Sequence, residues 1–250
     1  MIHFHSSNLF NSETDLLSMM GKHVMLEFAT QPDNHALLTE IAHSFAMSNP
    51  NWKNFKGKEV LSEFREFNNW IEGWSRHPGF DFYLMPFSSD PKNPSLRKQW
   101  ENYCSAEILI KGVPVFNINH PTEELDAILA AKPQKIALTS DPFQPPRGSS
   151  AWWTAISKVM VKLVDEKGRP ISQIHGVDML DPTIFSHVPL ASADSNPDSQ
   201  TAVKNSTDRS KPWSLSSRSE KIILMDRIEK HASASFWKDW SQNKNYHLLG

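Results

Sequence analysis

Ile108-Leu-Ile-Lys-Gly-Val-Pro-Val-Phe-Asn-Ile118 opens the part of the sequence that decides the fold, and Lys135-Ile-Ala-Leu-Thr-Ser140 closes it. The first stretch is predicted to be extended, although a glycine and a proline interrupt it, and the second reads as a short buried strand. Between them, Thr122 caps a helix that runs through Ala131. A strand, a helix and a strand in this order predict two parallel strands joined by a right-handed crossover.

The same alternation continues on both sides of this unit. We predict further strands at 2–6, 22–29 and 80–87, and helices at 13–20, 33–48, 58–76, 95–104 and 149–167. The chain is therefore predicted to be an α/β protein, with a mostly parallel sheet and flanking helices. The sequence allows either a doubly wound sheet or an incomplete barrel, and in both the ligand site belongs at the carboxyl ends of the strands.

Two of these helices carry the strongest patterns. Six apolar residues recur at three- and four-residue spacing in the helix 58–76: Val60, Leu61, Phe64, Phe67, Ile71 and Trp74. Such an aromatic stripe favours core packing, with a partner-binding face as the alternative. In 149–167 the helical period favours one helix ending at Gly168, and a hairpin around Asp165–Gly168 is the competing interpretation.

The last quarter of the chain differs in composition. Serine accounts for nine of the 29 residues of Ala191–Ser219, and few of the others are large and apolar. We therefore expect an α/β domain at 1–190, a flexible linker or loop at 191–219, and a C-terminal amphipathic helix at 220–250 packed on the domain.

Composition and motifs exclude several classes of function. The net charge is −2 without a run of lysine or arginine, which argues against strong duplex DNA binding through bulk charge. Neither G-x-G-x-x-G nor a P-loop motif is present, so the usual nucleotide phosphate loops are excluded. With one cysteine, Cys104, no signal peptide and no long apolar run, we expect a soluble cytoplasmic protein that does not enter membranes.

Polar side chains fall at the predicted strand ends and form the candidate site. His3 and His5 share one face of the first strand, about 7 Å apart at Cα, which is close enough to share a metal ion. Asp141 follows the buried strand and would complete the metal site or act as a general base, and His120 is the second candidate catalytic residue. The alternative for the histidine pair is a partly exposed terminal strand without a ligand.

Two segments resemble metal-dependent hydrolases of the TatD deoxyribonuclease type. That family begins with a strand ending in I-D-x-H-x-H, and this chain has Ile2-His3-Phe4-His5-Ser6-Ser7, so His5 keeps one histidine. Gly112–Arg147 is similar to the last third of the family, with Asp141 as the matching aspartate. The two mid-chain histidines would fall near Glu27 and Pro86, where neither is histidine. The resemblance therefore implies an altered or decayed metal site.

Two functions remain open from the sequence. One is a metal-assisted hydrolase or nuclease-like enzyme, with the cofactor unidentified beyond a divalent metal ion. The other is a non-enzymatic interaction or regulatory protein, because nine tryptophans and a serine-rich segment suit contact with a protein partner.

Overall fold

The computed structural model describes residues 1–9, 16–28, 32–54, 60–88, 96–140, 145–195 and 225–238. Nine parallel strands form one sheet in the order β5-β4-β3-β2-β1-β9-β8-β7-β6. The strands are β1 (Ile2–Ser6), β2 (His23–Glu27), β3 (Ser44–Ser48), β4 (Phe80–Leu84), β5 (Gly112–Val113), β6 (Val115–Asn117), β7 (Lys135–Thr139), β8 (Gln173–Gly176) and β9 (Ser192–Asp194).

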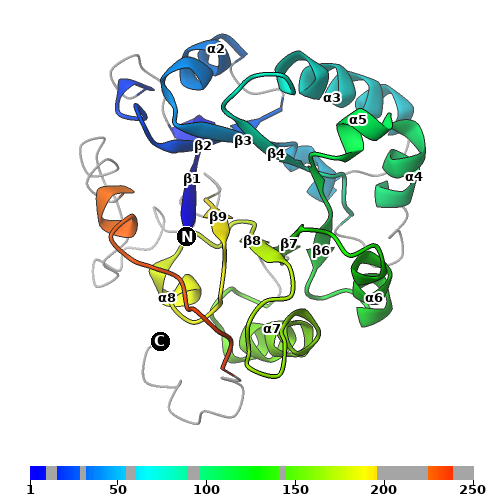
Figure 1. Cartoon of the computed structure of the whole chain (residues 1–250), viewed down its shortest axis with the longest axis vertical. Coiled ribbons are helices and arrows are strands. Elements are labelled where there is room, and N and C mark those ends of the chain that lie inside the picture. The colour runs from blue at the N-terminus through cyan, green and yellow to red at the C-terminus, as the bar shows by residue number, and fades with distance from the viewer. Residues whose placement is uncertain are drawn as a thin grey trace.

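The two strands at the ends of the sheet, β5 and β6, are consecutive in the chain and separated only by Pro114. The Val113 carbonyl accepts a hydrogen bond from Met85 N at 3.0 Å on one side, and the Pro114 carbonyl accepts one from Ala137 N at 2.9 Å on the other. One extended segment therefore bridges both ends, and the sheet rolls into a nearly closed barrel (Figure 1). Of the two architectures that the sequence left open, the barrel is correct.

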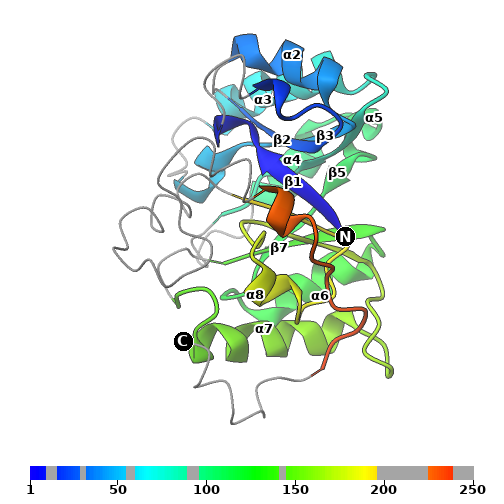
Figure 2. The ribbon, with the colours of Figure 1, turned by 90° about the vertical axis from the view of Figure 1, so that its left-hand side faces the viewer.

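Helices surround the barrel, as the two views show (Figures 1 and 2). They are α2 (Pro32–Ile41), α3 (Val60–Trp74), α4 (Leu96–Tyr103), α5 (Ala106–Leu109), α6 (Thr122–Ala130), α7 (Ser150–Leu163) and α8 (Pro182–Phe185), with short 3-10 turns η1 (Ser7–Leu9) and η2 (Pro50–Asn54). The plan of alternating parallel strands and outer helices is that of the (β/α)₈ barrels.

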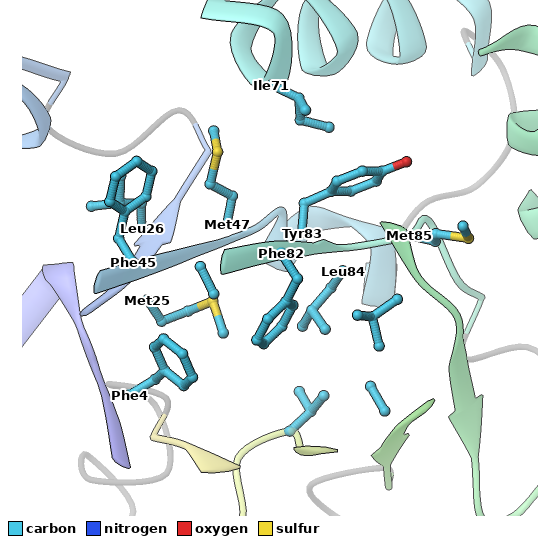
Figure 3. Packing of buried hydrophobic residues seen from close by; sticks show 14 of the residues in the cluster. Phe4, Met25, Leu26, Phe45, Met47, Ile71, Phe82, Tyr83, Leu84 and Met85 are labelled. Carbon is cyan, nitrogen blue, oxygen red and sulfur yellow. The ribbon is translucent and has the colours of Figure 1, made fainter. Parts of the chain in front are cut away.

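Each strand separates a lumen layer from an outer layer. Figure 3 shows Phe4, Met25, Phe82 and Leu84 on the lumen side, and Tyr83 with other residues on the side of α3. Phe64, Phe67 and Ile71 of α3 are fully buried, so most of the predicted stripe is core, whereas Leu61 is 66% exposed and does not belong to it. Both faces of the sheet are thus covered, as is usual for parallel strands.

One predicted helix was too long. The helix expected at 33–48 ends at Ile41, and Ser44–Ser48 forms β3 between β2 and β4. Phe45, Ala46 and Met47 are all fully buried, because one of them faces the lumen while its neighbours face the helices. Because Phe45–Met47 is apolar on both faces, it shows no alternation, and it was therefore assigned to the preceding helix.

The helix predicted at 149–167 is also shorter, because α7 ends at Leu163. Val164 pairs with Pro170 in an antiparallel bridge, and Asp165 Oδ1 accepts hydrogen bonds from the backbone of Lys167 and Arg169. The hairpin interpretation is therefore correct for this end. Gly168 has a φ of +75°, and an added Cβ would lie 2.4 Å from the Trp237 carbonyl oxygen, so glycine is required there.

The described part of the C-terminal segment crosses the outside of the barrel. Residues 225–228 are helical, but 231–238 are not, so the helix expected within 220–250 is interrupted. Its backbone groups bond to the barrel instead: Ala234 N donates to Phe185 O at 3.0 Å, and Trp237 N donates to Gly168 O at 2.7 Å. The range 191–219 contains β9 at its start, and residues 196–219 lie outside the described part.

Candidate active site

The carboxyl ends of the strands carry a dense set of buried polar side chains. Each of them is at most 9% exposed: Ser6, Ser7, Glu27, Asn49, Ser88, Asn117, His120, Thr139, Ser140, Asp178, Asp194 and Ser195. Because all strands are parallel, their carboxyl ends meet at one end of the barrel, which we call the carboxyl mouth.

Asp194 ends β9, beside the first strand, and is 4% exposed. Its Oδ1 accepts a short hydrogen bond from the backbone N–H of Asp178. Its Oδ2 lies 3.6 Å from Nε2 of His175, which is beyond hydrogen-bond distance. In the part of the chain that the structure describes, no hydrogen bond to Oδ2 is found, so this oxygen is available to a ligand.

Asp178 comes two residues after β8 and is held by Arg147. Arg147 Nη2 donates to Asp178 Oδ2 at 2.9 Å, and Arg147 Nε donates to Ser140 Oγ at 3.2 Å. The two charged side chains are 12% and 5% exposed. Asp178 has a φ of +57°, a left-handed conformation that costs energy for a residue with a side chain. That conformation directs its N–H to Asp194, so strain is used here to position a carboxylate.

Glu27 ends β2 and is fixed by neutral donors. The Ser6 hydroxyl donates to Oε1, and Asn8 Nδ2 donates to Oε2 at 2.6 Å. The Glu27 backbone N–H donates in turn to Ser7 Oγ at 3.3 Å. These bonds tie the end of β2 to the end of β1 and hold the carboxylate in one orientation.

His120, one of the two predicted catalytic residues, follows β6 at the mouth and is 8% exposed. Its Nδ1 lies 2.9 Å from Glu124 Oε2 on the first turn of α6. The backbone N–H of His120 donates to Asn117 O at 2.9 Å, which closes the turn after the strand. Asp141, the other predicted catalytic residue, lies outside the described residues, whereas the adjacent Ser140 is at the mouth.

His3 and His5 share one face of β1 as predicted, but that face points away from the lumen. Phe4 between them contacts the rings of Phe82 and His175 inside the barrel, so its neighbours point outward. His3 contacts the ring of Phe185 in α8, and burial together with the nearby His5 lowers the pKa of His3 to about 4.

His5 bonds to the C-terminal segment. Its Nε2 lies 2.8 Å from Glu229 Oε1, and Lys22 Nζ donates to Glu229 Oε2 at 2.7 Å. The hydrogen bond from His5, with a second from Lys22, lowers the pKa of Glu229 to about 2 although burial opposes this. His5 therefore helps to hold residues 225–229 against the outside of β1.

The described residues do not by themselves complete the metal site implied by the TatD resemblance, because Asp141 lies outside the described part of the chain. Among the described residues there is no group of three histidine, cysteine, aspartate or glutamate side chains placed to hold a metal ion. The two histidines of β1 lie on the opposite side of the strand from Glu27 and Asp194.

The sequence reasoning did not find Asp178, Asp194 or His175. Asp178 follows β8, a strand that the sequence analysis did not predict because Gln173-Ile-His-Gly176 has neither an apolar run nor an alternating pattern. Asp194 was hidden because β9 is three residues long and begins the serine-rich range.

The fold and the site define a parallel α/β barrel with an acidic carboxyl mouth. Comparison of the chain with models of protein families, with curated proteins and with solved structures gives no match. The resemblance to the TatD-type hydrolases therefore rests only on the two segments quoted above. In the described ranges, no helix has the length and apolar character needed to span a membrane.

Proposed function

We propose that this protein is a hydrolase, or a group-transfer enzyme with the same chemistry, whose reaction takes place at the carboxyl mouth with Asp194 as the main catalytic carboxylate. One observation carries the proposal. Among the described residues, the buried acidic side chains are Glu27, Asp178 and Asp194, and all three lie at strand carboxyl ends. Burying carboxylates opposes folding, so their concentration at the end where barrel enzymes place their sites supports a catalytic role.

These carboxylates occupy one arc of the barrel. They come from β2, β9 and β8, which are contiguous in the sheet except for β1 between the first two. Within the arc the Asp178 carboxylate is bound by Arg147, and both oxygens of Glu27 accept hydrogen bonds. Asp194 keeps Oδ2 available, so it is the group placed to accept a proton from water or to attack an electrophilic centre.

Catalytic roles for His120 and Asp141 stay predictions. His120 lies at the mouth beside Glu124 and would supply a proton to a leaving group. Asp141 would add a further carboxylate after β7. The metal-assisted form of the hydrolase proposal depends on Asp141, because the described donors do not form a metal site.

The interaction-protein alternative has less support. Trp52, Trp100 and Trp152 are fully buried, and Trp153 and Trp237 are nearly so. These tryptophans serve the core, so the feature that suggested a partner surface is largely accounted for by packing.

The test is a panel of chromogenic substrates offered to the full chain: p-nitrophenyl glycosides, esters, phosphate monoesters and diesters, with a single-stranded oligonucleotide for nuclease activity. We expect turnover in one class and a loss of about 100-fold or more in Asp194→Asn, which keeps the shape but cannot act as a base. The control is Asp126→Asn, which alters an exposed partner of Lys162. Turnover by no class, or full activity in Asp194→Asn, would overturn the proposal. Activity lost only in Asp141→Asn would instead favour the site predicted from the sequence.

A further inference from the structure

A chain of three side chains lies inside the barrel beneath the carboxyl mouth. His175 on β8 is fully buried, and its Nδ1 is 2.9 Å from Ser192 Oγ on β9. Its Nε2 faces Asp194 Oδ2 at 3.6 Å. Ser192 and Asp194 are two residues apart on the same strand and point to the same side, so one imidazole spans both.

The imidazole is held in this orientation by its surroundings. The ring of Phe82 packs against it with a centroid distance of 5.1 Å, and the ring of Phe4 does so at 6.1 Å, both edge to face. Nε2 is buried and has no hydrogen-bond partner among the described residues, which is unusual for a fully enclosed histidine nitrogen. The packing therefore fixes which nitrogen faces the carboxylate, and only the position of the proton remains to be assigned.

We infer that His175 is a positioning residue for Asp194, with its proton on Nε2 and the Ser192 hydroxyl donating to Nδ1. This inference rests on the proposed catalytic role of Asp194. An Nε2–H directed at Oδ2 attracts the carboxylate, whereas a nitrogen lone pair directed at it repels it. Because the gap is 3.6 Å, Nε2–H orients the Asp194 carboxylate without occupying Oδ2.

Among the described residues, the group that bonds to the other oxygen of Asp194 is a backbone N–H and not a cation. The Asp178 N–H contacts Oδ1, while Arg147 is engaged by the Asp178 carboxylate and Ser140. The imidazole is therefore the side-chain donor that the described residues place against Asp194. Ser192 is 1% exposed and lies deeper in the lumen. Its hydroxyl therefore fixes the tautomer of His175 and does not act as a nucleophile toward a ligand at the mouth.

The proton position can be measured without an enzymatic assay, by ¹⁵N NMR of the full chain labelled at histidine. We expect the Nε2–H tautomer for His175 in the wild type and a mixture of tautomers in Ser192→Ala. Assignment uses His175→Gln, which removes the signal, and thermal melts confirm that each variant is folded. An Nδ1–H tautomer in the wild type, or no change in Ser192→Ala, would overturn the inference while leaving the proposed function intact.

A matched pair of variants tests the consequence for activity. The amide nitrogen of Gln can replace Nε2, and that of Asn can replace Nδ1, so only His175→Gln keeps a donor toward Asp194. Once a substrate is identified, we expect kcat to fall about 10-fold or more in His175→Asn and to be largely restored in His175→Gln, with KM little changed. Equal losses in two folded variants would contradict the inference. If both Asp194→Asn and His175→Asn kept full activity, the proposed function would be contradicted as well.

Discussion

The ion-paired contact between the C-terminal segment and β1 makes a quantitative prediction about stability. Glu229→Gln keeps the size of the side chain but removes the charge that His5 and Lys22 share. A pKa of about 2 against an ordinary 4.5 corresponds to at most about 3 kcal/mol of unfolding free energy. Since the Glu229 side chain is 31% exposed, solvent screening reduces this to about 2 kcal/mol at pH 7.

The sign of the pH dependence follows from the lowered pKa. A carboxylate with a depressed pKa contributes stability that is fully present above pH 4.5 and is lost as the pH falls through about 2. Urea unfolding of wild type and Glu229→Gln should therefore give curves that differ by about 2 kcal/mol at pH 7 and converge toward pH 2. Asp226→Asn is the control, because Asp226 is a 57% exposed partner of Lys22 and should cost less than 0.5 kcal/mol, about the limit for a surface pair. A difference that is absent at pH 7, or that stays constant down to pH 2, would refute the reasoning.

Two further predictions concern the core around α3 and His3 of β1. Phe64→Ala should lower the free energy of unfolding in urea by about 3–5 kcal/mol, because Phe64 is fully buried against Trp52 and Trp100. The control Leu61→Ala, on the exposed side of α3, should change it by no more than about 0.5 kcal/mol. Similar losses for both variants would contradict the assigned helix face. His3, with a pKa lowered to about 4 by burial, should make the wild type lose up to about 3 kcal/mol as the pH falls from 6.5 to 4, since the unfolded chain takes up the proton first. His3→Gln should flatten this part of the profile, and an unchanged slope would show that other groups cause it.

The fold could be predicted where local patterns agree with burial. The helix α6 and the strand β7 of the unit at 108–140, the helix α3 and the strands β1, β2 and β4 all appear where the residues indicated them. Residues 108–111, which were predicted to be extended, instead lie in α5 and the turn after it. Strand β3 was missed because both of its faces are covered, which removes the alternation that distinguishes a strand from part of a helix. Strand β9 was missed because three residues are too few to show an alternating pattern, and the serine content of the segment led to the prediction of a linker.

The site could be predicted in its location but only partly in its residues. Parallel strands place their carboxyl ends together whatever the side chains are, so His120 was correctly expected at that end. The histidine pair of β1 illustrates the limit. Alternation correctly places His3 and His5 on the same side of the strand, but it does not say which side is the lumen. That choice depends on Phe4, whose ring packs in the lumen against Phe82, a residue 78 positions later in the chain.

The opposite sides of β1 thus separate two uses of charge. Outside the barrel, His5 and Lys22 both bond to Glu229 and attach the C-terminal segment, so the Glu229 charge is used for structure. At the mouth, Asp194 is bonded through one oxygen, while among the described residues the other faces a histidine nitrogen beyond bonding distance. Leaving a buried carboxylate partly unsatisfied reduces stability, and a strained Asp178 backbone adds to the cost. The protein satisfies both oxygens of Glu229 outside β1 but keeps one oxygen of Asp194 available. This contrast is expected if the Asp194 carboxylate serves to bind a ligand.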